Sequence, residues 1–280
     1  MFLASLQAIP ASGAVRAILA ILLLALVTTD IVLGWRQHRT FRTELEATPT
    51  AQRESVRIAL LGRWIRMGVA SALTVCLAVV LIPGLELAQL GLRAPDLASR
   101  LGAVTNSTVA GMLTGILVGA IAVAFITRRV LKNTSKVALA GSDALDPMMP
   151  RTARGRWWWG GLALSAGVTE EIVYRGLAIL ALAIVFPQAS STAIVITAAA
   201  LFGIAHLYQG WVGVLMTGAV GFVLGNLYLS TSSLVIPMVL HVLVDLRLLI
   251  MRPRAESDVQ ESAVPAGAMS LTVAGRPVLP

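Results

Sequence analysis

The sequence contains little of what a soluble or a disulfide-linked protein needs. Its single cysteine, Cys76, lies inside an apolar run, so the chain can form no internal disulfide. We expect Cys76 to be a small packing residue and not a nucleophile. Charged residues make up only 13% of the chain and hydrophobic residues 57%, whereas a soluble domain has about a quarter charged residues. This composition, with a mean hydropathy of +0.82, argues against a soluble globular domain.

The apolar residues are gathered into long runs. A helix needs about 20 consecutive apolar residues to cross a hydrocarbon core about 30 Å thick. Runs of this kind predict spans at residues 14–35, 64–85, 108–127, 191–207, 211–229 and 234–251. The stretch 157–186 is also apolar but is interrupted by charged residues, so it is either one long tilted helix or a full span followed by a short return. We therefore predict an all-α fold, a polytopic transmembrane helical bundle with seven or eight spans.

The net charge of +8 comes almost entirely from arginine. Nucleic acid is a common partner of basic chains, but these arginines lie at the ends of apolar runs, where they suit anionic lipid headgroups. They are concentrated in two polar loops, 36–63 and 128–156, which the positive-inside rule places in the cytoplasm. We expect the middle of the first loop to be an exposed helical stretch. Asp30 is expected at the membrane interface, and the aromatic run 157–159 is expected to anchor at headgroup level.

Ionisable residues inside the apolar runs are the candidate functional residues, because each is costly in lipid unless it is paired or faces a polar cavity. The first group is Glu170, Glu171 and Arg175. On a helix Glu171 and Arg175 lie four positions apart and can pair, whereas Glu170 points about 100° away, without a local cation. An unpaired carboxylate in such a place suits a general base. A salt-bridge network between helices explains this group equally well.

Two histidines lie in separate predicted spans further along the chain. Phe202 and His206 share one helix face, and His241 and Asp245 share another, so Asp245 could hold the imidazole of His241 in one orientation. A lone histidine in an apolar helix is more often a core residue than a site residue. Three polar groups in three helices are harder to explain independently, and we predict that they converge on one polar cavity.

Such a cavity would suit hydrolysis of a peptide bond. Glu170 and His206 would activate a water, directly or through a metal, and His241 with its neighbour would stabilise the oxyanion. Zinc takes histidine and carboxylate ligands, so Glu170, His206 and His241 are candidate zinc ligands. The sequence does not require zinc, because it contains neither the H-E-x-x-H motif nor the G-x-S-x-G elbow.

These polar groups resemble, in order and spacing, the three signature motifs of the CPBP family of intramembrane proteases. That family includes the CAAX prenyl endopeptidases and the Abi-type relatives linked to bacteriocin self-immunity. The motifs are Glu170-Glu171-x-x-x-Arg175, Phe202-x-x-x-His206 and His241-x-x-x-Asp245, and the run Gly218-x-x-Gly221-x-x-x-Gly225 and residues 231–237 also resemble the family. The resemblance covers roughly residues 157–251, and the first three predicted spans carry no recognised motif.

The resemblance implies roles for the candidate residues. Glu170 with His206 would activate the hydrolytic water, and His241 with residue 245 would form the oxyanion site. Many relatives have asparagine where this chain has Asp245. An ionised aspartate only accepts hydrogen bonds, so Asp245 must either orient His241 or be protonated.

The apolar runs, the charge pattern and the resemblance together predict the organisation of the chain. Residues 1–156 would form an N-terminal membrane region with three spans and the two basic cytoplasmic loops, 157–251 a CPBP-like catalytic membrane core, and 252–280 a disordered tail. We expect an intramembrane endopeptidase of the bacterial cytoplasmic membrane that cleaves a membrane-associated protein or peptide, in CAAX-like or bacteriocin-related processing. Nucleic acid is not expected as a partner, and the sequence leaves the oligomeric state open.

Two other functions remain open. One is a non-catalytic regulatory or self-immunity protein on the same scaffold, because function depends on the site and not on the fold. The other is a transporter that uses the buried carboxylates as a proton relay.

Overall fold

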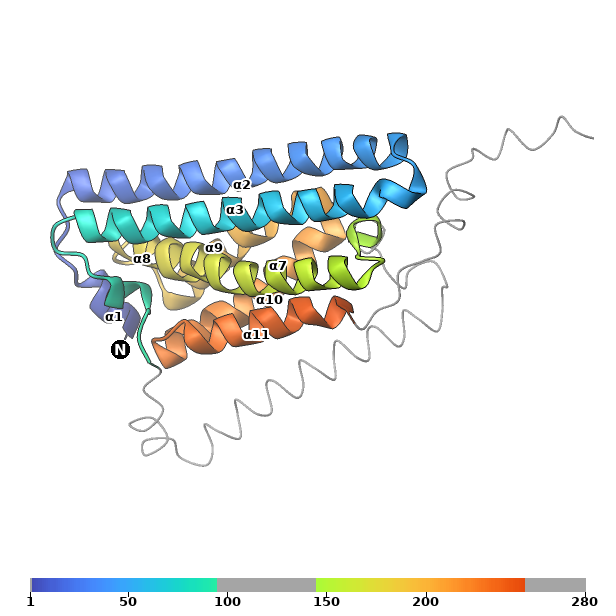
Figure 1. The fold of residues 1–280 in the computed structure, drawn as a ribbon. Helices are drawn as coiled ribbons and strands as arrows, with labels where there is room; N and C mark the ends of the chain where they lie inside the picture. The colour runs from blue at the N-terminus through green and yellow to red at the C-terminus, as the bar shows by residue number, and fades with distance from the viewer. Residues whose placement is uncertain (1, 95–144, 250–280) are drawn as a thin grey trace, which may run out of the picture.

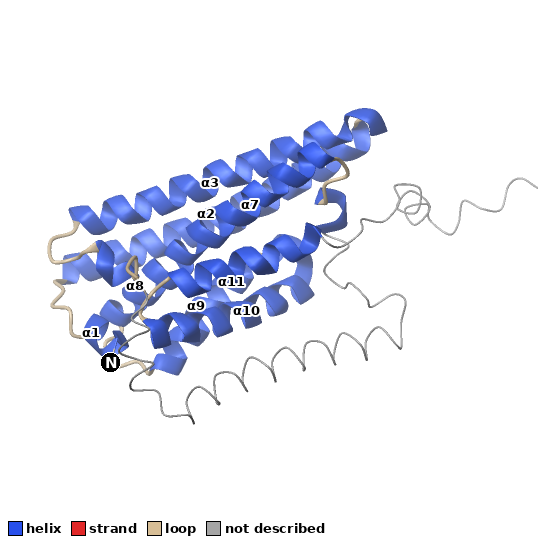
Figure 2. Cartoon of the chain, turned by 60° about the horizontal axis from the view of Figure 1, so that its bottom comes forward, coloured by secondary structure: helices blue, strands red, loops and turns tan. Residues whose placement is uncertain are grey.

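The structure is a computed structural model that describes residues 2–94 and 145–249 (Figure 1). Within these ranges the regular elements are all helical and there is no strand (Figure 2). The all-α fold is therefore confirmed for the part of the chain that the structure describes. The predicted span at 108–127 and the predicted tail at 252–280 lie outside it, and the three-region division with boundaries at 156 and 251 stays a prediction.

The N-terminal part is a long helical hairpin preceded by a short helix. Helices α1 (Phe2–Gln7), α2 (Gly13–Ala47) and α3 (Arg53–Leu81) follow one another, with the 3-10 turn η1 (Thr50–Gln52) between α2 and α3. The prediction of a polar loop at 36–63 with a helical middle is wrong, because both helices run through this segment and only its middle turns. Arginine, glutamate, leucine and alanine favour helix, while Pro49 removes a backbone donor and restricts the residue before it to extended conformations. Thr48 adopts such a conformation, at φ −94° and ψ 133°.

The C-terminal part begins with one continuous helix. Helix α7 (Ala153–Glu171) passes into the π-helical segment η4 (Ile172–Leu177) and then into α8 (Ala178–Val185). Of the two descriptions that the sequence allowed for 157–186, the structure shows the single long helix. The remaining elements are η2 (Leu87–Leu90), η3 (Asp146–Met148), α9 (Ser191–Ala205), η5 (Leu207–Gln209), α10 (Gly210–Thr231), α11 (Val235–Leu246) and η6 (Arg247–Leu249).

Glycines allow α9 and α10 to approach each other closely in this part. A Cβ atom on Gly203 of α9 would lie 2.6 Å from the carbonyl oxygen of Val214 on α10, and one on Gly221 of α10 would lie 3.3 Å from the Cα of Ala199. Helix α7 packs against α3 on one side and against α11 on the other (Figures 1 and 2). Small residues permit this close approach, as is usual between membrane helices. The crossing of α7 and α11 brings the first and third predicted motifs together.

Three helical segments of the described chain are long and apolar enough to cross a membrane, at Gly13–Ala47, Thr50–Leu81 and Leu207–Thr231. Their apolar side chains face outward, and Leu81 and Leu215 are 69% and 71% exposed. Such a surface suits lipid as the surrounding solvent. The chain is therefore an integral membrane protein, and the count of seven or eight spans stays a prediction.

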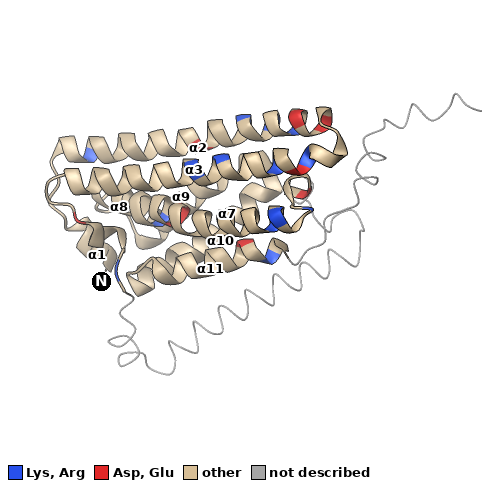
Figure 3. Ribbon diagram, viewed as in Figure 1, with Lys and Arg blue, Asp and Glu red and all other residues tan. Residues whose placement is uncertain are grey.

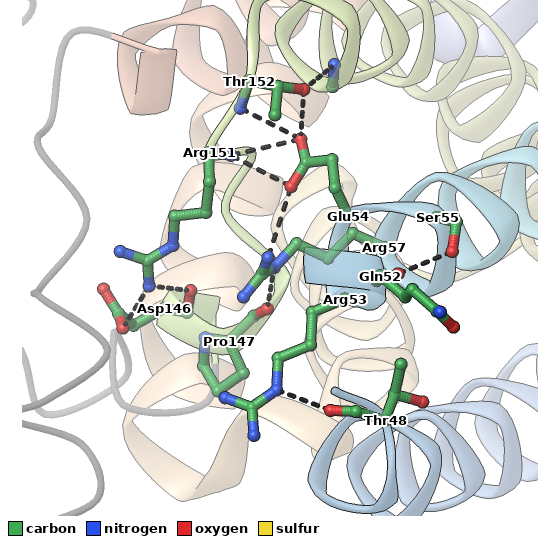
Figure 4. Close-up of polar contacts among 11 residues, drawn as sticks. Thr48, Gln52, Arg53, Glu54, Ser55, Arg57, Asp146, Pro147, Arg151 and Thr152 are labelled. Atoms are coloured by element: carbon green, nitrogen blue, oxygen red, sulfur yellow. Dashed lines mark hydrogen bonds and ion pairs between the residues drawn. The ribbon is translucent and has the colours of Figure 1, made fainter. Parts of the chain in front are cut away.

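Charged residues gather at the end of the bundle where α2 meets α3 (Figure 3). There Glu54 of α3 accepts hydrogen bonds from the backbone N–H groups of Arg151 and Thr152, at 3.2 and 3.1 Å, and from the Thr152 hydroxyl, at 2.8 Å (Figure 4). Glu54 also pairs with Arg57, whose Nε donates to the carbonyl oxygen of Pro147 at 2.9 Å. These contacts fix the start of α7 to α3. They also place the described part of the second basic segment beside the first, as the sequence predicted.

We predict that this charged end faces the cytoplasm, because arginine is retained on that side of a membrane. In a Cys76→Ser background, Thr50→Cys at this end should resist an impermeant maleimide in intact cells and should react after permeabilisation. Ala88→Cys, exposed near the opposite end, is the matched control and should react in intact cells. Labelling of Thr50→Cys in intact cells, with Ala88→Cys protected, would reverse the orientation.

Candidate active site

The six side chains predicted from the sequence lie together in the core of the bundle. Glu170 and Glu171 end α7, Arg175 lies in η4, His206 caps the C-terminus of α9, and His241 and Asp245 lie on α11. Each is linked to another of the six by a separation of 3.9 Å or less. The convergence of the three motifs is thus found in the structure. The catalytic roles of these residues remain predictions.

Glu171 connects two of the three motifs. Its side chain is fully buried, and its Oε1 accepts hydrogen bonds from Arg175 Nη1 and from His241 Nδ1, both at 2.7 Å. The pair with Arg175 was predicted from the helical spacing. The orienting partner of His241 was expected to be Asp245, and this is corrected, because Asp245 Oδ2 lies 3.8 Å from His241 Nε2, beyond hydrogen-bonding distance. Because α7 crosses α11 closely, Glu171 lies nearer to the His241 ring than Asp245 does, although Asp245 is on the same helix as His241.

His206 is held by the backbone of its own helix. Its Nδ1 lies 2.9 Å from the carbonyl oxygen of Phe202. A carbonyl oxygen only accepts, so Nδ1 carries the proton, and in the neutral ring Nε2 is left as an acceptor. That Nε2 lies 3.9 Å from Glu170 Oε2. The sequence predicted only that Phe202 and His206 share a face, and the structure makes Phe202 the support of the ring.

The Phe202 side chain also packs against both histidines. Its ring centroid lies 4.7 Å from that of His206 and 5.8 Å from that of His241, in edge-on geometry, and the Arg175 guanidinium lies 4.3 Å from it. Edge-on pairs and cation–π contacts of this kind are favourable in a desolvated core. Phe202 is 1% exposed, so it fixes the three polar side chains around it.

Glu170 faces both histidines without bonding directly to either. Its side chain is 29% exposed, but Oε2 is buried and has no hydrogen-bond partner among the described residues. This atom lies 3.9 Å from His206 Nε2 and 3.8 Å from His241 Nε2. Both separations exceed the roughly 2.7–3.2 Å of a direct hydrogen bond. They suit a water molecule that bridges the carboxylate and the imidazoles.

The candidate zinc ligands Glu170, His206 and His241 have suitable donor atoms, but their spacing does not fit a closed zinc site. At zinc–ligand distances of about 2.0–2.2 Å, two ligands of a tetrahedral site lie about 3.4 Å apart. The separations from Glu170 Oε2 are 3.8 and 3.9 Å, and within residues 2–94 and 145–249 no group of three acidic, histidine or cysteine residues is arranged to hold a metal ion. Zinc therefore stays a prediction.

Asp30 was expected at the membrane interface, and its depth in the membrane stays a prediction. It lies near the middle of α2, because that helix continues to Ala47, and its Oδ2 accepts a hydrogen bond of 2.8 Å from the hydroxyl of Tyr174 in η4. The rule that an ionisable residue inside an apolar run marks a site would have selected Asp30 as it selected Glu170. Its partner Tyr174 was missed because the contact joins two residues, on different helices, that lie 144 positions apart in the sequence.

The aromatic run at 157–159 divides between two environments. Trp157 is 84% exposed, as expected of an anchor at headgroup level. Trp159 is only 5% exposed, and its Nε1 donates to the carbonyl oxygen of Asp245 at 3.2 Å. Trp159 is therefore a contact between α7 and α11 and not an anchor.

The fold and the site define an integral membrane protein with a glutamate–histidine cluster buried in its helical core. Residues 152–247, about a third of the chain, match the family described as type II CAAX prenyl endopeptidase Rce1-like. This region is therefore similar to the type II CAAX prenyl endopeptidases. All six candidate residues lie within the match, and α2 and α3 lie before it. No curated protein and no solved structure matched the chain.

Proposed function

We propose that this protein is a CAAX-type intramembrane endopeptidase in which Glu170 is the general base. The observation that carries the proposal is the buried Glu170 Oε2 atom, which has no hydrogen bond within the described chain and faces the Nε2 atoms of two histidines. A buried carboxylate oxygen without a hydrogen-bond partner is costly in a membrane core, which suits a functional role for Glu170. In a proton relay or a purely structural ion pair, we would expect this oxygen to have a hydrogen-bond partner.

The geometry supports a simple hydrolytic sequence. A water between Glu170 and His206 donates one hydrogen to the carboxylate and the other to the free Nε2 of the imidazole. Glu170 removes the first proton as the water oxygen bonds to the peptide carbonyl carbon, which forms an oxyanion. When the C–N bond breaks, Glu170 returns that proton to the leaving amine.

His241 is assigned to the oxyanion. Its Nε2 faces Glu170 at 3.8 Å, and its Nδ1 is held by Glu171, so the ring has one nitrogen free for the reacting atoms. Donation to an oxyanion requires a proton on that nitrogen, and hence a ring protonated on both nitrogens. Asp245 lies on the same side of the ring and does not contact Nδ1, which suits a charge partner better than an orienting group.

The family match supports a protein or peptide substrate within or at the membrane. We propose CAAX-like C-terminal processing as the first reaction to test. Bacteriocin-related processing stays a prediction that no observation favours.

The test is a comparison of membrane proteins from cells that carry the wild-type chain or Glu170→Gln. This substitution keeps the size of the side chain and removes the base, so at least one cleavage product should fall to the level of cells without the protein. Glu46→Gln, on a side chain that is 74% exposed at the charged end, is the matched control and should retain every product. If Glu170→Gln retains every product that depends on the wild-type protein, Glu170 is not the base and the proposed mechanism is rejected. If cells with and without the wild-type protein make the same products, the non-catalytic alternative is favoured.

A further inference from the structure

Helix α2 brings the carboxylate of Asp30 to the π-helical segment that follows Glu170 and Glu171. Asp30 lies outside the residues that match the protease family, and its partner Tyr174 lies inside them. The Tyr174 hydroxyl donates to Asp30 Oδ2 at 2.8 Å, and Tyr174 is only 2% exposed. Asp30 lies within an apolar span, where a carboxylate is costly without a role. This hydrogen bond therefore joins the N-terminal hairpin to the core that carries the candidate residues.

Tyr174 stands between Asp30 and the histidine support. It follows Glu170 and Glu171 by a single helical turn, in the π-helical segment, a type of distortion often found at functional sites. Its ring centroid lies 5.1 Å from that of Phe202. Phe202 in turn holds His206 through its carbonyl oxygen and its ring. A displaced Tyr174 would therefore change the packing behind His206.

We propose that Asp30 is a positioning residue of this active site. Its carboxylate fixes the Tyr174 ring against Phe202, and Phe202 keeps the His206 imidazole opposite Glu170. Asp30 acts through these side chains and does not contact the reacting water. The inference rests on the proposed function for its meaning in catalysis, but the positioning can be measured without a substrate.

The variants separate the hydrogen bond from the fold. Asp30→Leu removes the acceptor, Tyr174→Phe removes only the donor hydroxyl, and Asp30→Asn keeps an acceptor oxygen in nearly the same place. Thr29→Val is the matched control, because the neighbouring Thr29 is exposed on the outer face of α2.

The first readout is the ¹⁵N spectrum of the three histidines in detergent micelles, assigned with His38→Gln and His206→Gln. Asp30→Leu and Tyr174→Phe should both shift the His206 signals and speed exchange of its Nδ1 proton. Asp30→Asn should restore the wild-type signals, and Thr29→Val should not change them. The double variant Asp30→Leu/Tyr174→Phe should match the single variants, because both remove the same bond.

The second readout is the Glu170-dependent cleavage product. It should fall by at least about tenfold in Asp30→Leu and Tyr174→Phe, since displacement of a catalytic group by a fraction of an ångström has effects of this size. Asp30→Asn should recover most of it. If Asp30→Leu does not fold, Tyr174→Phe decides the question alone.

Wild-type His206 signals in Tyr174→Phe would overturn the inference, as would an Asp30→Leu variant with unchanged signals and product. A result in which Glu170→Gln retains every product has a different meaning. It rejects the proposed function, while the histidine spectra still decide whether Asp30 positions His206.

Discussion

Glu171→Ala should abolish both folded protein and activity, whereas Glu170→Gln should abolish activity alone. Glu171 is fully buried and accepts from both Arg175 and His241. The Arg175 guanidinium is only 2% exposed, and the loss of Glu171 removes its nearest anion. Breaking a buried pair from one side typically costs about 3–5 kcal/mol. Glu170 Oε2 has no hydrogen-bond partner in the described chain, so replacing Glu170 breaks no such contact.

Thermal unfolding in one detergent and formation of the cleavage product measure the two effects side by side. Glu170→Ala is the size-matched control for Glu171→Ala, and it should unfold near the wild-type temperature. Two outcomes would contradict the assigned roles: a Glu171→Ala variant as stable as Glu170→Ala, or a Glu170→Gln variant that still makes product.

Local rules predicted a large part of the site. The four-residue spacing of Glu171 and Arg175 predicted their ion pair, and the apolar runs predicted α9 and α10 to within a few residues. The placement of Glu170, His206 and His241 in three separate apolar runs indicated a shared site, because a single buried polar residue must find partners on other helices. The structure brings these three side chains together.

The predictions that failed concern contacts between helices that are distant in the sequence. The partner of His241 is decided by how closely α7 crosses α11, and no spacing within one helix reports that distance. The hydrogen-bond partner of Asp30 likewise depends on how closely α2 approaches the π-helical segment. A polar loop was predicted across residues 36–63, whereas only residues 48–52 separate α2 from α3. Charge was taken as a sign of a loop, although arginine and glutamate favour helix.

Gly167→Ala should separate α7 from α11 and strongly reduce activity. Gly167 lies one turn before Glu170 and Glu171, and Val242 follows His241, so this crossing sets the distance between the two motifs. A Cβ atom on Gly167 would overlap the Val242 side chain and would lie 2.9 Å from the Val242 nitrogen and 3.2 Å from the Met238 carbonyl oxygen. Backbone atoms cannot rotate away as a flexible side chain can, so the helices must move apart. Overpacking of this kind costs about 1–3 kcal/mol.

The catalytic loss should exceed what the stability loss explains. The 2.7 Å bond from His241 to Glu171 and the 3.8 Å gap to Glu170 both span this crossing. A shift of a few tenths of an ångström should lengthen both and reduce product formation by up to about tenfold in the protein that remains folded.

Gly160→Ala is the matched control on the same helix. A Cβ atom there would meet no described atom within 4 Å, and alanine favours a helix over glycine by up to about 1 kcal/mol. This variant should unfold at or slightly above the wild-type temperature and retain full activity. Thermal unfolding and product formation, normalised to folded protein, are measured for both variants. Full activity per folded molecule in Gly167→Ala would show that the α7–α11 distance does not set the geometry of the site, and equal losses in both variants would point to glycine in α7 rather than to the crossing.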